Sequence, residues 1–210
     1  MCVNTEFDWT HTIRTNILML QFVGLWPKGK ESYTLNLYTI YAFISVVVIL
    51  GGNNFFQVVN MFFVYNDLEA LASTVFITIT FVQTSIKICI FVHNIDLLKN
   101  LIWWLNGTEL KPKNEMQINI VRPSLKLWKT IHVWFFSAAI VITFTWLVLP
   151  LLNASQTKQL PLNAWYPYKY TVRPLYELTY LYQAIGALYL AVTNVHMDTT
   201  IVALMIYIAA

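Results

Sequence analysis

The chain has 210 residues, of which 58% are hydrophobic and 11% charged, and its formal net charge is +3. A soluble domain ordinarily carries about 25% charged residues, so the composition argues against a soluble protein and for an integral membrane protein. We interpret the basic residues as spread over three loops without forming a stripe, which argues against nucleic-acid binding.

Residues 1–31 form an N-terminal segment in which charged and apolar residues alternate in blocks. Its apolar stretch, Ile17 to Trp26, ends at Pro27 and is too short to cross a bilayer. No run of small residues follows it, so a cleavable signal peptide is not indicated. The pattern predicts a cytoplasmic, re-entrant or interfacial segment ahead of the first span.

The remainder, residues 32–210, is predicted to be a transmembrane domain. Four windows are almost free of charge, and none shows the alternation of a membrane β-strand. About 20 residues of helix cross a bilayer, so each window accommodates one span. The sequence therefore predicts an all-α, polytopic bundle with helices over about 33–64, 70–95, 131–152 and 178–210.

The distribution of Lys and Arg predicts the orientation of these helices. The N-terminal segment and the connection over residues 96–129 together hold nine Lys and Arg residues. The connections on the other side, 67–69 and 153–177, together hold three. Because basic loops stay in the cytoplasm, we expect the N-terminus to be cytoplasmic, opposite to the topology of a G-protein-coupled receptor.

Two charged side chains fall inside the predicted spans, Lys87 and Asp198. Both are expected near the cytoplasmic membrane face, and for Lys87 we favour snorkelling of the ammonium over a pairing or gating role. The mid-span sequence Gly51-Gly52-Asn53-Asn54 is interpreted as a close helix–helix contact rather than a ligand site.

No catalytic constellation or phosphate-binding loop is present, so an enzyme is not predicted, and no cofactor is expected. Three histidines are predicted near the cytoplasmic face without carboxylate or Cys partners at ligand spacing, so no metal site is predicted. They are His93, His132 and His196. Of two glycosylation sequons, Asn153 is expected outside the cell and is the candidate for modification, whereas Asn106 is expected in the cytosol.

An aromatic, proline-rich segment between the third and fourth spans carries a family resemblance. The order of its motifs resembles the second extracellular loop and fourth-helix entry of insect odorant receptors. These motifs are Leu160-Pro161, Ala164-Trp165-Tyr166-Pro167, Pro174-Leu175-Tyr176, Tyr180 and Tyr182-Gln183. Asp198 is similar to an acidic position in the same helix, and Gly24-Leu25-Trp26-Pro27 resembles the family's segment before the first helix.

The resemblance implies a seven-helix receptor subunit in the plasma membrane of olfactory sensory neurons. It implies assembly with an odorant receptor co-receptor into a cation channel that small, volatile, hydrophobic ligands open. The pore would be lined by the seventh helix. This chain reaches the fourth helix, so it is expected to be an N-terminal fragment.

An odorant site needs apolar and aromatic walls with few polar groups. We expect one between the outer halves of the second, third and fourth spans. Trp165, Tyr166 and Pro167 are expected to shape an extracellular lid. The candidate ligand contacts are Phe76, Thr80, Phe81, Thr143, Trp146, Leu147, Tyr182, Gly186 and Tyr189.

Two other functions remain open at this point. A gustatory-type chemoreceptor channel would share the inverted topology. A multi-span transporter would be expected to show inverted repeats and broken helices, and we find no repeat in the sequence.

Overall fold

The structure is a computed structural model, and it describes the chain except residues 1–8, 30–32, 108–111, 113, 153–158 and 210. The described residues form helices joined by loops, with no β-strand among them. The glycosylation candidate Asn153 lies outside the described residues.

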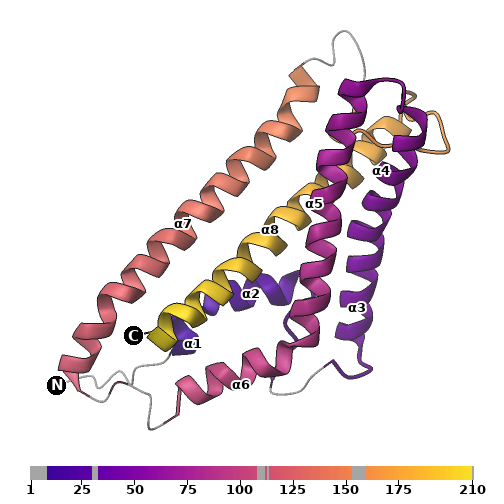
Figure 1. Ribbon diagram of the computed structural model, residues 1–210. Coiled ribbons are helices and arrows are strands. Elements are labelled where there is room, and N and C mark those ends of the chain that lie inside the picture. The colour runs from indigo at the N-terminus through magenta and orange to yellow at the C-terminus, as the bar shows by residue number, and fades with distance from the viewer. Residues whose placement is uncertain (1–8, 30–32, 108–111, 113, 153–158, 210) are drawn as a thin grey trace.

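Four described helical segments are long and apolar enough to cross a membrane. The first is continuous through α3 (Leu37–Ser45), the π-helical turn η1 (Val46–Gly51) and α4 (Gly52–Phe63). The others are α5 (Leu68–His93), α7 (Glu115–Leu152) and α8 (Leu175–Ala209). The chain runs up and down between them, with α8 packed between α7 and the other spans (Figure 1). The all-α membrane bundle predicted from the sequence is therefore confirmed.

The connection predicted over residues 96–129 is largely helical. The short helix α6 (Ile95–Leu105) runs across one end of the bundle, and α7 begins at Glu115 rather than near 131 (Figure 1). Charge and polarity marked this stretch as a loop, but a helix can continue past the apolar layer with its polar residues in water. At the other boundary, the carboxylate of Asp67 accepts hydrogen bonds from the backbone of Glu69 and Ala70 and so caps α5.

The N-terminal segment enters the bundle rather than lying on its surface. It contains α1 (Trp9–Thr12) and α2 (Arg14–Phe22), and α2 packs against α8. Leu20, Val23 and Leu25 are all buried. Asn16 is also buried, and its amide donates to the hydroxyls of Thr199 and Thr200 on α8. The predicted re-entrant segment thus becomes part of the core.

The side chain of Lys99 attaches α6 to this segment. Its ammonium donates to the carbonyls of Pro27 and Gly29 at 2.8 and 3.1 Å, and burial lowers the pKa of Lys99. Three parts of the chain that are distant in the sequence, α1 with α2, then α6, then α8, meet at one end of the bundle.

The chain turns sharply after α2, and Gly24 makes this turn possible. Its φ of 86° is one that L side chains rarely adopt, and a Cβ added there would lie 2.8 Å from Cα of Ala42 on α3. Glycine therefore meets two requirements, the left-handed backbone and the close approach of α3.

Four tyrosine hydroxyls satisfy the backbone carbonyls exposed by this turn. Residues 21–24 are the end of α2 and the turn after it, so their carbonyls lack the partners that a continuing helix would supply; that of Gln21 also accepts from the backbone of Gly24. The carbonyl oxygens of residues 21, 22, 23 and 24 accept, in that order, from Tyr38, Tyr41, Tyr189 and Tyr33. We call these four side chains the tyrosine cap. Irregular backbone inside a membrane protein requires such partners, because no water is available in the apolar layer.

The mid-span Gly-Gly-Asn-Asn sequence lies against α8. A Cβ on Gly52 would overlap the hydroxyl of Tyr182, and a Cβ on Gly186 would overlap the amide of Asn53. The same Tyr182 hydroxyl donates to the carbonyl of Val48 in η1, and Asn53 donates to that of Ile49. The interpretation of this sequence as a close helix–helix contact is confirmed.

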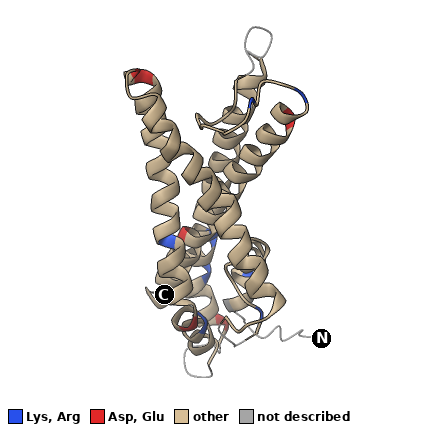
Figure 2. Cartoon of the chain, turned by 90° about the vertical axis from the view of Figure 1, so that its right-hand side faces the viewer, with Lys and Arg blue, Asp and Glu red and all other residues tan. Residues whose placement is uncertain are grey.

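Lys and Arg are unevenly distributed along the long axis of the molecule. In Figure 2, most of the Lys and Arg residues lie near the end of the bundle that holds the last turns of α8, and a few lie on the loop at the opposite end. We call these the basic end and the loop end of the bundle.

The tyrosine cap generates the first prediction. Tyr189→Phe removes the hydroxyl that donates to the buried carbonyl of Val23 at 2.7 Å. Leaving this carbonyl without a partner should lower the free energy of unfolding by about 1–3 kcal/mol. Thermal unfolding of the full-length protein in detergent measures the loss. Tyr65→Phe, at an exposed tyrosine, is the control and should unfold like wild type; equal stability of the two variants would contradict the role of the cap.

Candidate functional site

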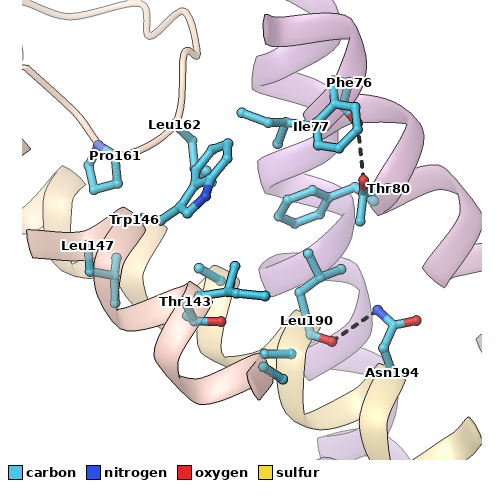
Figure 3. A pocket seen from close by; sticks show the side chains of 15 residues that line it. Phe76, Ile77, Thr80, Thr143, Trp146, Leu147, Pro161, Leu162, Leu190 and Asn194 are labelled. Atoms are coloured by element: carbon cyan, nitrogen blue, oxygen red, sulfur yellow. Dashed lines mark hydrogen bonds between the residues drawn. The ribbon is translucent and has the colours of Figure 1, made fainter. Parts of the chain in front are cut away.

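A cavity of about 310 Å³ lies between three spans, on the loop-end side of their midpoints. Figure 3 shows side chains from α5, α7 and α8 converging on it, with the loop after α7 closing one side. Its volume is within the range of natural small-molecule sites, about 300–1,000 Å³.

Apolar and aromatic side chains make up most of the cavity wall. In Figure 3 the indole of Trp146 projects from α7 between Leu162 of the loop and the side chains of α5. The lining residues are Phe76, Ile77, Thr80, Phe81, Ala139, Ile142, Thr143, Trp146, Leu147, Pro161, Leu162, Ala187, Leu190, Ala191 and Asn194.

Three polar side chains interrupt this apolar wall. Thr80 donates its hydroxyl to the carbonyl of Phe76, and Asn194 donates its amide to Thr84 at 2.7 Å and to the carbonyl of Leu190. The Thr143 hydroxyl has no hydrogen-bond partner among the described residues. Thr143 is therefore the polar group with its full bonding capacity open to a ligand.

A buried glutamine attaches the loop to α8 above the cavity. Gln183 is fully buried; its amide donates to the carbonyl of Leu162, and its oxygen accepts from the Leu162 backbone at 2.9 Å. The same amide donates to the hydroxyl of Tyr166, and burial raises the pKa of Tyr166, so this phenol stays neutral. Gln183 thus positions the wall that Pro161 and Leu162 contribute.

The predicted lid residues contact α4 rather than the cavity. The Trp165 ring stacks on Phe63 with centroids 5.2 Å apart, and its backbone donates to the carbonyl of Phe56. Tyr166 packs against Phe56, while Pro167 is exposed. These residues hold the loop to α4; closure of the cavity falls to the preceding residues, Pro161 and Leu162.

The structure brings six of the nine predicted ligand contacts together around one cavity. They come from α5 and α7 and are Phe76, Thr80, Phe81, Thr143, Trp146 and Leu147. Whether each contacts a ligand remains a prediction.

The three candidates on α8 do not line this cavity, and their role as ligand contacts remains a prediction. Tyr182, Gly186 and Tyr189 share one face, as their spacing predicts, but that face contacts η1, α4 and the turn after α2. The cavity face of α8 lies roughly 120° further round the helix, at about 100° per residue. The aromatic character of the two tyrosines indicated a ligand wall. In the structure, however, the hydroxyls of Tyr182 and Tyr189 donate to the backbone carbonyls of Val48 and Val23.

Sequence reasoning missed the face of α8 that lines the cavity and the alanines that make room for it. Ala187, Leu190, Ala191 and Asn194 follow the i, i+3, i+4, i+7 spacing of one helix face, and Ala139 faces them from α7. This spacing was readable from the sequence. Nothing in it, however, distinguishes a cavity lined by alanine from a close contact between two helices.

The charged pair inside the spans lies outside the cavity. The Lys87 ammonium is 2.8 Å from one carboxylate oxygen of Asp198 and 3.0 Å from the other, joining α5 to α8. The favoured interpretation of Lys87 as a snorkelling side chain is therefore wrong, because the ammonium is held by a carboxylate at the same depth. The pairing alternative is what the structure shows.

A second polar cluster joins α7 to α8 near the basic end. The Trp128 indole donates to the carbonyl of Thr199, and the rings of His132 and His196 lie 5.5 Å apart. Among the residues described by the structure, no three metal-ligating side chains come together.

Comparison with known proteins identifies the family. The model of the "7tm Odorant receptor" family matches residues 67–210, which include α5 to α8 and the whole cavity. The chain belongs to the odorant receptor family. It is therefore a multi-pass membrane protein of a receptor family and not of an enzyme family.

Two curated insect odorant receptors are similar in sequence. Odorant receptor Or1 of Anopheles gambiae is 27% identical over 206 residues, covering 96% of this chain and 48% of that protein. Odorant receptor 83a of Drosophila melanogaster is 38% identical over 66 residues, covering 31% of this chain and 14% of that protein. The chain thus spans about half the length of the relative that it matches throughout.

The fold is also that of a solved receptor. The insect olfactory receptor OR5 from Machilis hrabei, determined alone and in complex with eugenol, superposes with a TM-score of 0.72 in both cases. Identity is 20% and 21%, and the alignment covers 96% of this odorant receptor chain and 55% of the other.

The Lys87–Asp198 pair generates the second prediction. In the full-length receptor, Asp198→Leu leaves the Lys87 ammonium without its partner, so it should destabilise the fold more than the double replacement of Lys87→Met with Asp198→Leu. Directly bonded residues of this kind couple by about 0.5–3 kcal/mol. Unfolding free energies of wild type, both single variants and the double variant provide the cycle. Additive losses would show that the pair carries no coupling.

Proposed function

We propose that this odorant receptor binds its ligand in the cavity between α5, α7 and α8. In the complete subunit, occupancy would open a cation channel formed with an odorant receptor co-receptor. The ligand class is small, volatile and hydrophobic. The site of action would be the plasma membrane of olfactory sensory neurons.

The single observation that carries this proposal is the cavity itself. It is apolar, about 310 Å³ in volume, and lies within the segment that matches the family. An apolar ligand enters such a site mainly because its surface leaves water. The complex of the related-fold receptor OR5 with eugenol supports binding of a small molecule by proteins of this fold.

The arrangement of the walls supports a route from binding to gating. Three helices contribute to the cavity, so a ligand that contacts all three favours the helix arrangement in which those contacts are made. A ligand shifts an equilibrium only as far as its affinities for the two states differ. We propose that the open arrangement of the complete subunit is the one that fits the occupied cavity better.

The uneven charge supports an orientation for this receptor. We infer that the basic end faces the cytoplasm, as the Lys and Arg distribution predicts. The loop after α7, and the cavity below it, would then lie toward the outside. Odorants would reach the cavity from the extracellular side or from the outer leaflet.

The two alternatives lack comparable support. The family match favours an odorant receptor over a gustatory-type channel. A transporter would place its substrate among broken helices that offer helix ends to it, whereas the helices around this cavity, α5, α7 and α8, run continuously past it.

A pair of neighbouring alanines tests the proposed function. Ala139 lines the cavity, whereas Ala138, the preceding residue of α7, is exposed and does not line it. With the full-length gene expressed beside its co-receptor, Ala139→Leu should fill the cavity. It should reduce odorant-evoked current at least tenfold across a broad panel, while Ala138→Leu should respond like wild type.

Surface labelling confirms that both variants reach the membrane. A wild-type complex that stays electrically silent across the panel would overturn the receptor proposal. Equal responses of the two leucine variants would instead place the ligand elsewhere in the receptor.

The open Thr143 hydroxyl gives a prediction about ligand chemistry. Thr143→Val keeps the side-chain shape but removes the hydrogen-bonding group. Loss of a hydrogen bond worth about 1 kcal/mol lowers affinity roughly fivefold. The variant should therefore be about fivefold less sensitive to an alcohol or phenol, and equally sensitive to a hydrocarbon of similar size. Dose–response curves for such matched odorants measure the difference.

Thr145→Val is the matched control for this variant. Thr145 is exposed on the same helix, and its hydroxyl donates to the carbonyl of Val141. A uniform loss for polar and apolar odorants alike at Thr143→Val would mean that the hydroxyl does not contact the ligand.

A further inference from the structure

Three basic side chains form a stripe on α7 at the basic end. Arg122, Lys126 and Lys129 follow i, i+4 and i+7, and Val133 continues the series. At about 100° per residue, these four positions fall within roughly 60° of the helix circumference. The sequence interpretation that the basic residues form no stripe is therefore wrong for α7, because it treated residues 96–129 as a loop.

The stripe is not the face by which α7 packs. The buried residues Val121 and Trp128 define the face toward α8, roughly 120° away at the same residue spacing. α7 lies at the edge of the bundle, beside α8 (Figure 1). Arg122, Lys126 and Lys129 are exposed, and their side chains form no ion pair with any residue that the structure describes.

A shallow, largely open hollow lies along this stripe. It is lined by Lys126, Lys129, Thr130, Val133 and Trp134, so two ammonium groups and a hydroxyl are followed by apolar side chains. No carboxylate contributes to the lining. The only acidic residue of α7, Glu115, lies seven positions before Arg122, about 10 Å along the axis.

The position of the hollow along α7 matches a membrane interface. The charge-free part of α7 begins near Val133, so Lys129 lies about one turn and Lys126 about two turns outside the hydrocarbon layer. Trp134 is exposed, and tryptophan is a residue type that gathers at this level of a membrane. Further along the stripe, Ile140 and Phe144 are exposed and apolar.

We propose that this hollow binds the phosphate headgroup of an anionic glycerophospholipid, with one acyl chain lying along Val133, Ile140 and Phe144. Compact ammonium groups with rotatable donors suit a phosphate that is approached from several directions. The charge pattern selects an anionic lipid over a neutral one. The succession of basic, then aromatic, then aliphatic side chains has the same order as headgroup, glycerol and chain. This proposal does not depend on the proposed odorant site.

Lipid titration of the purified full-length receptor tests the site. Dioctanoyl phosphatidylserine and its phosphatidylcholine counterpart differ in headgroup charge but not in chain length, and native mass spectrometry counts the molecules bound. We expect wild type to prefer the serine lipid at least tenfold. K126Q/K129Q should lose this preference, whereas K126R/K129R should retain most of it.

The matched control removes the same charge elsewhere. Lys28 and Lys169 are exposed and lie away from the hollow, so K28Q/K169Q should keep the preference of wild type. All variants should unfold at the wild-type temperature, which separates loss of the site from loss of the fold. An unchanged preference in K126Q/K129Q would overturn the proposal.

Two further measurements distinguish other occupants. Inorganic phosphate and glycerophosphoserine are each added as competitors to the bound serine lipid. If either displaces it as well as an equal concentration of dioctanoyl phosphatidylserine does, this is a site for free phosphate. If wild type binds both lipids equally while Lys126 and Lys129 are protected from amine-reactive labelling in cell membranes, a protein segment covers the hollow. Either outcome would overturn the lipid assignment.

Discussion

The structure depends on satisfying backbone carbonyls where the chain stops being α-helical inside an apolar bundle. The turn after α2 and the π-helical turn η1 both release carbonyls, and tyrosine hydroxyls bind them. Each unsatisfied group would cost several kcal/mol in a medium without water, so these bonds determine where α2, α3 and α8 can lie. Tyr182 and Tyr189 of α8 supply two of them. The packing of the first half of the chain therefore fixes which face of α8 is left for other uses.

That division of α8 creates the candidate site. One face carries hydroxyls and Gly186, and it contacts η1, α4 and the turn after α2. A second face carries Ala187 and Ala191, whose small side chains leave space opposite Ala139 of α7. Gln183 then holds the loop over this space through its bonds to Leu162. Rigid attachment on one side of α8 and free volume on the other are what a ligand-responsive helix bundle requires, because the volume can be occupied without disturbing the attachment.

Polar contacts near the basic end give the bundle a well-connected base. Asn16 of α2 and Trp128 of α7 both bond to the Thr199–Thr200 region of α8, and Lys87 pairs with Asp198 one residue before it. The cavity lies at the less polar half of the same helices. The basic stripe on α7 faces away from these contacts and is left to interact with the surroundings.

Hydrophobic windows and charge counts in the sequence alone determined the all-α membrane bundle and its four spans, and the order of its motifs carried the resemblance to odorant receptors. The windows also placed Phe76, Thr143 and Trp146 on faces that converge on one cavity. Helix rotation was decided only by tertiary structure, since composition cannot show whether a tyrosine such as Tyr189 contacts a ligand or a backbone carbonyl. The same holds for the start of α7 at Glu115 and for the Lys87–Asp198 pair, residues 111 positions apart. Periodicity specifies which residues share a face, whereas the partner of that face depends on contacts between distant parts of the chain.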